Sequence, residues 1–351
     1  MAEVILDRVS KRFSDTLAVS DLSLRVADGE FVVLLGPTGA GKTTTLRLVA
    51  GLERPDTGRI EISGSEVTSL SAAERNVCFV FQQYSLYPHY SVYDNLAFPL
   101  RAPSRRWSAT EIDARVREVA GLLRIDSKLK NRATQLSGGE MQRVAIGRAL
   151  VRTPTVYLMD EPLSSLDAKL REDLRVELKR IQRDLGATIL YVTHDQLEAM
   201  TLADRIGVLS EGKLIQIGAP RDIYERPDNV YVARRLGSPQ INILPPGHLG
   251  LADLPPGTAS VGARPEDILL ERDDGPLAEV LSVEHLGVET VVLLGLGGQR
   301  VHALLGAHTP RQVGESLRIA VRPGAALFFD DAGRRIASPV ADTAAEAAYG
   351  T

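Results

Sequence analysis

The chain carries the stretch Gly-Pro-Thr-Gly-Ala-Gly-Lys-Thr at residues 36–43, which fits the pattern G-x-x-x-x-G-K-[ST] without a mismatch. The apolar run at 31–35 predicts a buried strand before it, and residues 44–50 predict a helix after it. At such a helix start, unpaired backbone N–H groups and the helix dipole favour an anion. The stretch therefore predicts a phosphate-binding loop; the alternative is a glycine-rich turn that binds nothing.

Within this loop, individual residues have separate expected tasks. The glycines allow the backbone to approach a phosphate closely. Lys42 is expected to reach the outer phosphates, and the hydroxyl of Thr43 is expected to hold a magnesium ion. The predicted phosphate-binding residues are Gly36, Pro37, Thr38, Gly39, Ala40, Gly41, Lys42, Thr43 and Thr44.

Length and composition set broad limits. The chain has 351 residues, enough for two domains with proper cores. Its net charge is only −4, so composition gives no reason to expect a nucleic-acid partner. The single cysteine, Cys78, lies in an apolar run, which favours a buried hydrophobe in a reducing compartment. No apolar run approaches the ~18 residues that span a bilayer. We therefore expect a cytosolic chain that meets a membrane only through partners.

Polar residues follow three further predicted strands. Gln82 follows the run at 77–81, Asp160 and Glu161 follow the run at 155–159, and His194 follows the run at 188–192. The carboxyl ends of strands in an α/β sheet are where ligands bind. Asp160 is expected to bind magnesium through its water shell, and Glu161 to polarise an attacking water. A lone histidine after a strand is usually structural, but here it joins two other polar strand ends.

The middle of the chain has a different texture. Residues 84–100 concentrate aromatic side chains between prolines, and residues 110–125 predict a helix with one apolar face. The aromatic cluster is either the core of a helical insert or a docking surface, and composition alone does not separate the two. The turn Ser137-Gly138-Gly139 opens a predicted helix at 141–151 and forms a second anion site by the same physics.

One aromatic residue stands near the start of the chain. Phe13 falls in a polar loop predicted at 10–16, upstream of the phosphate loop. It would either stack on a purine ring or anchor local packing.

Together these motifs resemble the nucleotide-binding subunit of ATP-binding-cassette (ABC) transporters. The resemblance identifies 36–43 as Walker A, Gln82 as the Q-loop glutamine, Leu-Ser-Gly-Gly-Glu at 136–140 as the signature, 156–160 as Walker B, 164–167 as the D-loop and His194 as the switch histidine. The signature carries the most weight, because a Walker A motif occurs in many NTPases. Thr38, Glu140 and Ser165 depart mildly from the usual residues of the family.

The resemblance implies a role for each site residue. Phe13 would stack on adenine, while Gln82, Thr43 and Asp160 would serve the Mg²⁺ site. Glu161 would act as general base and His194 would hold the γ-phosphate of ATP. The signature residues Ser137, Gly138 and Gly139 would contact the ATP of a second subunit. The chain has one Walker A, one signature and no internal repeat, so the family implies a homodimer that closes on ATP.

The rest of the chain suggests a second domain. Prolines and glycines at 245–257 mark its entry, and short alternating runs with glycine turns follow, as in a small barrel. Gly-Ala-Arg-Pro-Glu at 262–266 resembles the start of the regulatory TOBE domain of maltose-type importer ATPases. The expected architecture is an α/β P-loop NTPase domain at 1–236 with a helical subdomain at about 84–150. A small all-β, OB-like barrel follows at 237–340, and then a loose tail at 341–351.

The resemblance implies the energy-coupling ATPase of an ABC importer for a carbohydrate, glycoside or polyol. Uptake of a polyamine, glycerol phosphate or oxyanion by the same machinery is the alternative. A soluble ABC ATPase of ribosomes or DNA is the alternative from another class, although the chain shows neither two cassettes nor a coiled-coil insertion.

The implied partners follow from the importer type. Two transmembrane permease subunits would dock near residues 84–100, which favours the docking interpretation of that segment. An extracytoplasmic solute-binding protein would act indirectly, and a regulatory protein would bind the C-terminal domain. The implied location is the cytoplasmic face of the inner or plasma membrane.

Overall fold

The computed structural model describes residues 2–337 except 83, 103–105, 273–274 and 308. The predicted tail at 341–351 lies outside the described residues. The chain divides into two compact units, Met1–Pro220 and Arg221–Thr351.

The first unit is organised around a six-stranded sheet in the order β10-β9-β3-β8-β7-β6. All pairs are parallel except β10 with β9. The strands are β3 (Phe31–Leu35), β6 (Val77–Val80), β7 (Val156–Asp160), β8 (Ile189–Thr193), β9 (Arg205–Ser210) and β10 (Lys213–Gly218). Every residue of β3, β7 and β8 is buried, as expected for apolar strands covered on both faces.

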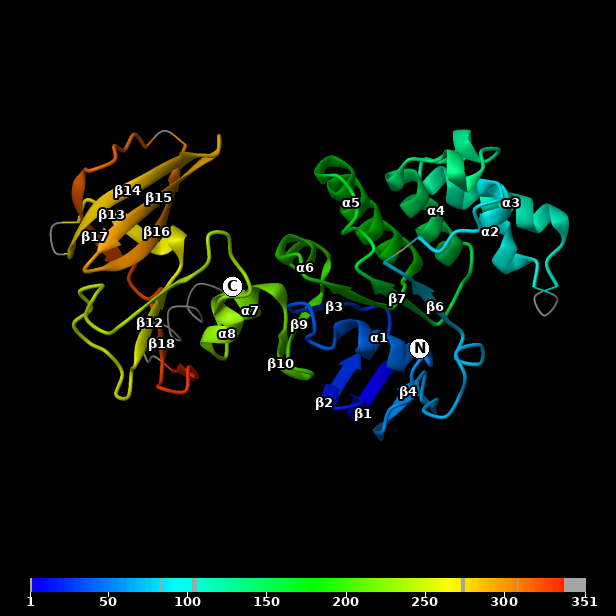
Figure 1. The fold of residues 1–351 in the computed structure, drawn as a ribbon, viewed down its shortest axis with the longest axis horizontal. Helices are drawn as coiled ribbons and strands as arrows, with labels where there is room; N and C mark the ends of the chain where they lie inside the picture. Colours follow the sequence, from blue (N-terminus) through cyan, green and yellow to red (C-terminus); the bar gives the residue numbers. More distant parts are fainter. Residues whose placement is uncertain (1, 83, 103–105, 273–274, 308, 338–351) are drawn as a thin grey trace, which may run out of the picture. The chain divides into compact units, whose positions relative to one another are not determined.

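Helices and a second sheet cover this central sheet. Figure 1 shows α5 (Ala168–Leu185) and α6 (Gln196–Leu202) on one side of it. On the other side lie α1 (Lys42–Ala50) and an antiparallel sheet in the order β2-β1-β4-β5. The strands of that sheet are β1 (Val4–Phe13), β2 (Thr16–Val26), β4 (Thr57–Ile62) and β5 (Ser65–Glu66). One apolar core joins the antiparallel sheet, α1 and the central strands.

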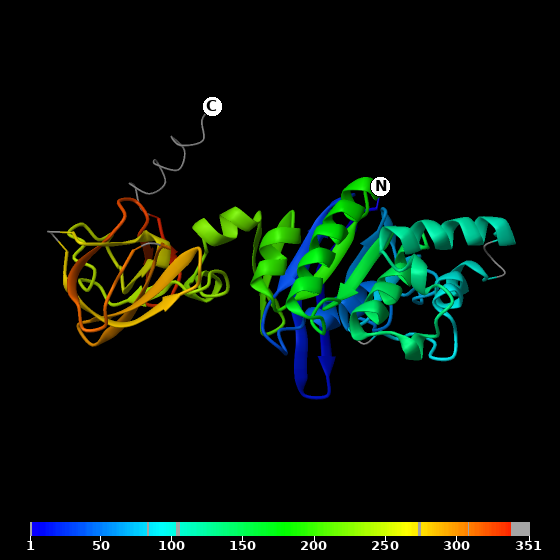
Figure 2. The same ribbon diagram turned by 90° about the horizontal axis from the view of Figure 1, so that it is seen from above.

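The predicted helical insert is present between β6 and β7. It contains α2 (Val92–Ala97), α3 (Ala109–Leu122) and α4 (Gly138–Leu150), with short 3₁₀ turns at η1 (Phe98–Leu100), η3 (Asp126–Lys128) and η4 (Ala133–Gln135). Helix α3 begins with a capping box between Ser108 and Glu111, and its buried face carries the apolar residues that predicted it. Figure 2 shows α3 and its neighbours grouped within the first unit.

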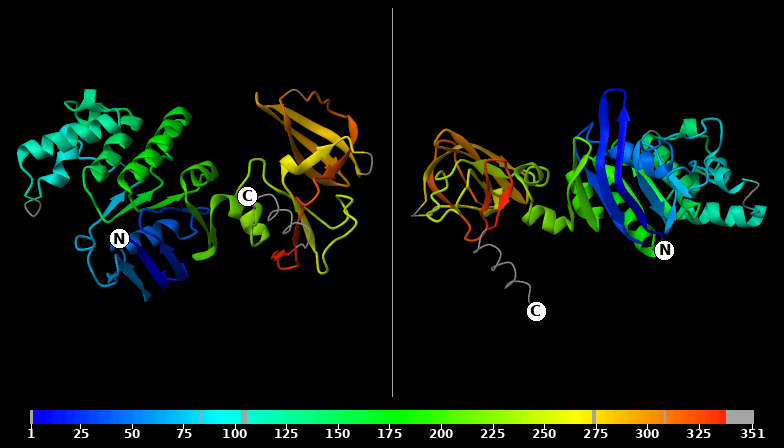
Figure 3. Two further views of the ribbon diagram at one scale, coloured as in Figure 1. Left: turned by 180° about the vertical axis from the view of Figure 1, so that it is seen from behind. Right: turned by 90° about the horizontal axis from the view of Figure 1, so that it is seen from below.

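The second unit is rich in strands. It contains α7 (Pro220–Glu225) and α8 (Val230–Ala233), a sheet β11-β12-β18-β19 and a sheet β13-β17-β14-β15-β16. The strands are β11 (Asn242–Leu244), β12 (Ser260–Ala263), β13 (Ile268–Leu270), β14 (Leu277–His285), β15 (Glu289–Leu296), β16 (Gln299–Gly306), β17 (Ser316–Val321), β18 (Leu327–Phe329) and β19 (Arg335–Ile336); the 3₁₀ turn η5 (Pro265–Asp267) lies between β12 and β13. Side chains from both sheets share one core, which agrees with the predicted small β-barrel, and Figure 3 shows the curled strands from two sides.

Two details differ from the expectations. The N-terminal hairpin is longer than predicted, because β1 continues through the expected polar loop to Phe13, which pairs with Thr16. The division of the chain falls after Pro220, whereas the sequence prediction placed the domain boundary after residue 236. The segment 221–236 therefore groups with the second unit, for which the packing of Arg264 described below gives the physical reason.

Candidate functional site

The phosphate loop connects the end of β3 to the start of α1, as predicted. Gly41 precedes α1 with φ 97°, and no side chain caps this helix. A Cβ atom at Gly41 would lie 2.4 Å from the carbonyl oxygen of Ala18, so only glycine fits there. The helix start thus leaves its backbone N–H groups facing a glycine-lined loop, which suits an anion.

Lys42 is held inside this loop and is only 6% exposed. Its Nζ donates to the carbonyl oxygens of Gly36 at 2.9 Å and Pro37 at 3.1 Å. Burial lowers the pKa of Lys42, while the carboxylate of Glu161, 3.7 Å from Nζ, raises it. The ammonium of Lys42 therefore lies within the phosphate loop, and the Glu161 carboxylate offsets only part of the cost of burying its charge.

Asp160 ends β7 directly beside the phosphate loop. The hydroxyl of Thr43 donates to Oδ1 of Asp160 at 2.8 Å. Burial raises the pKa of Asp160, and the hydrogen bond from Thr43 opposes that shift. A hydroxyl and a carboxylate that meet at a phosphate loop are the oxygen ligands Mg²⁺ prefers, so the donor set fits this ion.

Glu161 is the residue at which the other predicted groups meet. Its Oε2 lies 3.1 Å from Nδ1 of His194 and 3.4 Å from Nε2 of Gln82. The backbone of Glu161 has φ 43°, a left-handed conformation that costs about 1–3 kcal/mol for a residue other than glycine. Surrounding bonds hold it there: its N–H donates to Val192 and its carbonyl oxygen accepts from Ser164.

The structure thus brings together residues from four separate strand ends. Register explains this, since Leu35 of β3 pairs with Thr193 of β8, and Asp160 of β7 pairs with Val192. The polar residue after each of these strands consequently appears at the same edge of the sheet.

The signature residues lie at the start of α4. The hydroxyl of Ser137 accepts from the N–H of Glu140, and the Glu140 carboxylate accepts from the N–H of Ser137, which makes a capping box. A Cβ atom at Gly139 would come within 1.9 Å of Cδ2 of Leu170, and one at Gly138 within 3.1 Å of the Tyr84 hydroxyl. Within one chain, these glycines therefore allow close packing against α5 and the segment after Gln82.

Phe13 lies at the end of β1 and is 41% exposed. The Nζ of Lys11 lies 5.4 Å from the centroid of its ring. The ring is therefore partly exposed with the Lys11 ammonium over it, and its contact with adenine stays a prediction.

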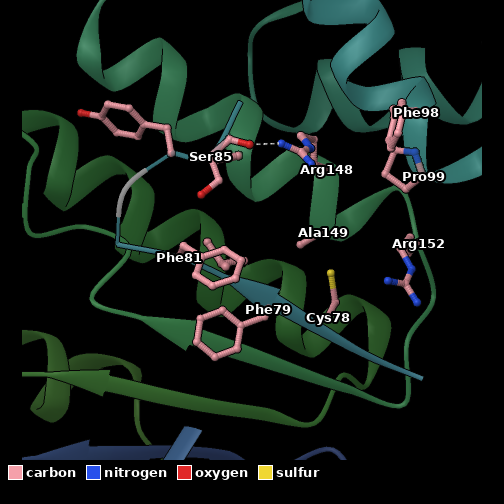
Figure 4. Close-up of a pocket in the computed structure, with 12 residues that line it drawn as sticks. Cys78, Phe79, Phe81, Ser85, Phe98, Pro99, Arg148, Ala149 and Arg152 are labelled. Atoms are coloured by element: carbon pink, nitrogen blue, oxygen red, sulfur yellow. Dashed lines mark hydrogen bonds between the residues drawn. The ribbon is translucent and has the colours of Figure 1, made fainter. Parts of the chain in front are cut away.

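The aromatic segment near residues 84–100 forms a cluster and borders a groove. The ring centroid of Tyr87 lies 4.6 Å from that of Phe98 and 5.2 Å from that of Tyr90. A cavity of about 270 Å³ opens beside this cluster (Figure 4). It is lined by Cys78, Phe79, Val80, Phe81, Tyr84, Ser85, Phe98, Pro99, Ala145, Arg148, Ala149 and Arg152. The three rings are exposed, so the segment forms a surface aromatic cluster beside one wall of the groove.

Sequence reasoning overlooked one contact of this site. Arg171, in the first turn of α5, pairs with Asp195 in the turn that carries His194. Only the three-dimensional structure brings these residues together, because an arginine on a helix has no distinctive local pattern.

Two features are absent from the part of the chain that the structure describes. Among the described residues, no three or more His, Cys, Asp or Glu side chains gather into a group that could hold a metal ion. No described helix is long and apolar enough to cross a membrane.

Known protein families match both units. The family described as ABC transporter matches residues 19–164, and the TOBE domain family matches residues 261–329. The dimeric structure of MJ0796, described as a bacterial ABC transporter cassette, superposes with a TM-score of 0.57 at 31% identity, covering 62% of this chain and 99% of that one. A post-hydrolysis dimer of the same cassette, bound to ADP and Pi, has the same values.

Full-length relatives are similar over both units. The sn-glycerol-3-phosphate import ATP-binding protein UgpC of Rhizobium meliloti is 44% identical, covering 96% of this chain and 100% of that protein. UgpC of Cupriavidus pinatubonensis is 42% identical with the same coverages. The geometry of the nucleotide site and these likenesses agree. The chain belongs to the ATP-hydrolysing, energy-coupling subunits of ABC importers that carry a C-terminal TOBE domain.

Proposed function

We propose that Glu161 is the general base of ATP hydrolysis in this chain. The observation that carries the proposal is the convergence on its carboxylate of Lys42 at 3.7 Å, His194 at 3.1 Å and Gln82 at 3.4 Å. Three groups from separate elements fix one carboxylate at the edge of a phosphate loop. Such positioning, together with charge neutralisation, is what phosphoryl transfer requires.

Each neighbour has its own task. Glu161 accepts a proton from the attacking water, and Gln82 and His194 orient its carboxylate and the γ-phosphate. Lys42 neutralises phosphate charge. The burial of Lys42 strengthens its attraction for the nucleotide, since water screens its charge less.

A magnesium ion would be held by Thr43 and Asp160, with Gln82 near it. When bound, Mg²⁺ neutralises charge on the transferred phosphoryl group. The hydrogen bond of 2.8 Å between Thr43 and Asp160 already sets these two ligands side by side.

We infer that two copies of this chain form the working ATPase. Ser137 and Gly139 lie at the start of α4. The N–H groups of this helix start suit a phosphate of the ATP that the second copy binds. The similar MJ0796 cassette, which was solved as a dimer, supports this arrangement. One phosphate loop and one signature in each chain give two equivalent composite sites.

The groove beside Phe98 is the proposed permease site. Its walls combine aromatic and aliphatic side chains with Arg148 and Arg152, which suits a short amphipathic helix with a polar end. Two permease subunits, one docked in this groove of each copy, would hold the pair at the cytoplasmic face of the membrane, and an extracytoplasmic binding protein would act through them.

The cargo proposed is a phosphorylated polyol of the glycerol phosphate type. The full-length relatives, named for import of sn-glycerol 3-phosphate, favour this over a neutral sugar. Uptake of labelled sn-glycerol 3-phosphate and of a neutral sugar by the complete transporter would separate the two. The C-terminal TOBE domain is the proposed docking site for a regulator.

The test of the base is ATP hydrolysis by the purified chain and by its Glu161→Gln variant. Loss of a general base lowers kcat by about 10²- to 10⁴-fold. The variant should also form a stable dimer in ATP and Mg²⁺, observed by size-exclusion chromatography with light scattering. Glu66→Gln, on an exposed edge strand, is the matched control. Normal turnover by Glu161→Gln would refute the role of Glu161, and a strictly monomeric variant would refute the dimer.

A further inference from the structure

Arg171 joins two turns that meet at the catalytic edge. Its Nη2 donates to the carbonyl oxygen of Leu166 at 2.9 Å, and its Nη1 lies 3.4 Å from Oδ2 of Asp195. The planar guanidinium can serve both partners at once because its donors point in fixed, separate directions.

The two turns have different neighbours. Leu166 belongs to the turn between Glu161 and α5, in which Ser164 bonds back to the carbonyl oxygen of Glu161 at 3.0 Å. Asp195 follows His194 and caps α6, with Oδ1 accepting from the N–H of Leu197 at 2.7 Å. Each turn is therefore anchored at one end to a residue of the proposed catalytic site.

These contacts close a ring. The Glu161 carboxylate contacts His194 at 3.1 Å, and Asp195 is the next residue of the chain. Asp195 pairs with Arg171, which donates to the carbonyl oxygen of Leu166. The turn that contains Leu166 leads back along the chain to Glu161. The link through Arg171 connects the 164–167 turn to the histidine turn by side-chain contacts. Movement of the 164–167 turn would therefore be passed to His194.

Stability alone does not account for the position of Arg171. It lies in the first turn of α5, where the helix dipole disfavours a cation. The side chains of Arg171 and Asp195 are half-buried, at 30% and 25% exposed, so water still screens their ion pair and limits its contribution to folding.

The structure assigns Arg171 as a positioning residue that couples the 164–167 turn to the orientation of His194 beside Glu161. The inference rests on the proposed roles of Glu161 and His194. It predicts that the ring, once opened at Arg171, leaves nucleotide binding intact but misplaces the groups that act on the attacking water.

The test compares Arg171→Gln, Asp195→Asn and the double variant in the full-length chain. Asparagine at 195 keeps an oxygen that can cap α6, so only the pairing with Arg171 is weakened. Each single variant is expected to lower kcat about tenfold, since small misplacements cost up to a hundredfold, while KM for ATP stays within about twofold. The double variant should be no slower than the singles, because both remove the same link.

Two further measurements separate coupling from loss of fold. Hydrogen exchange should quicken in peptides covering 164–167 and 194–199, with the melting temperature little changed. Arg171→Lys should recover only part of the activity, because a single ammonium lacks the fixed fork of donors. Arg180→Gln, which breaks an exposed ion pair with Glu177 on the same helix, is the control and should behave as the native chain.

The outcomes are distinguishable. Additive losses in the double variant, or a rise in KM without a fall in kcat, would overturn the coupling. If Glu161→Gln retains activity, the proposed base fails whatever Arg171 does. If Glu161→Gln is inactive and Arg171→Gln is unaffected, the catalytic proposal stands and only the coupling fails.

Discussion

At the scale of single residues, the nucleotide site buries two ionisable side chains whose charged forms burial destabilises. Lys42 is 6% exposed and Asp160 is also 6% exposed. Burial lowers the pKa of the first and raises the pKa of the second, so in both cases the charged form is disfavoured in the folded chain. A bound nucleotide with its metal ion would supply the missing counter-charges. The site therefore gives up some stability in return for affinity.

The first prediction concerns Asp160→Asn. The raised pKa of Asp160 means that the folded chain holds its proton to higher pH than the unfolded chain does. Burial of the charged carboxylate therefore destabilises the folded chain. This destabilisation is absent below the pKa that Asp160 has in the unfolded chain, and it is complete above the pKa that Asp160 has in the folded chain. Asp160→Asn should therefore raise the melting temperature of the nucleotide-free protein at neutral pH and leave it unchanged near pH 3.

The measurement is thermal unfolding across pH, with and without ATP and Mg²⁺. Added nucleotide should stabilise the native chain more than Asp160→Asn, since the variant lacks a proposed ligand. Asp173→Asn, at an exposed position of α5, is the control. A variant that is less stable than the native chain at every pH would contradict the argument.

The second prediction concerns Gly139. Because a Cβ atom there would meet Cδ2 of Leu170 at 1.9 Å, Gly139→Ala should force the half-buried Leu170 side chain out of its present rotamer, at a cost of about 0.5–1.5 kcal/mol. Adding Leu170→Ala should recover part of that loss. Chemical unfolding of the single and double variants checks this. Equal instability with and without Leu170→Ala would show that the strain lies elsewhere.

At the scale of elements, the sequence predicted those parts that depend on local patterns. The helix expected at 44–50 is α1 (Lys42–Ala50), and the strand expected at 31–35 is β3 (Phe31–Leu35). The polar residues at strand ends met as predicted because parallel register brings those ends to one edge. Motif and periodicity were sufficient there.

Non-local features could not be predicted in this way. The left-handed backbone of Glu161 depends on bonds to Val192 and Ser164, and residue type alone would disfavour it. The strand β1 extends through polar residues because Asp56 accepts from the N–H of Arg12 and the side chain of Lys11, contacts made across the fold. Tertiary contacts decided both features.

The third prediction concerns Arg264, which ties the segment 221–236 to the strands of the second unit. It is 5% exposed and lies 3.8 Å above the ring of Tyr224. Its guanidinium also donates to the carbonyl oxygens of Tyr224, Ala233 and Leu236. Arg264→Met leaves these buried acceptors without a donor, which should cost about 2–4 kcal/mol.

Calorimetry of the full chain, with hydrogen exchange to locate the change, checks this prediction. Protection should fall in peptides covering 221–236 and 260–270 and stay unchanged around the phosphate loop. Tyr224→Phe, which removes only the hydroxyl that donates to Glu266, should cost less, about 1 kcal/mol. Loss of protection throughout both units would argue against a local role of Arg264.

At the scale of the whole molecule, the boundary between the units decides where the chain can be cut. The family resemblance and the Pro-Gly-rich entry placed the boundary at 236, yet Ile223, Val232, Ala233 and Leu236 are fully buried and the segment groups with the second unit. Backbone bonds agree, since the N–H of Val230 donates to the carbonyl oxygen of Gly333. Segment 221–236 therefore depends on partners that lie a hundred residues later in the chain.

The last prediction follows from that dependence. A fragment of residues 1–220 should be monodisperse and bind ATP, because its core is complete without the second unit. A fragment of residues 1–236 should expose the four buried side chains of 221–236 and aggregate more readily. Light scattering, binding of a hydrophobic dye and ATP affinity compare the two. Because the proposed catalytic groups all lie before residue 195, removal of the second unit should spare hydrolysis and abolish only control by a regulator. If 1–236 is the better behaved fragment, then 221–236 packs with the first unit and the boundary predicted from the sequence is the correct one.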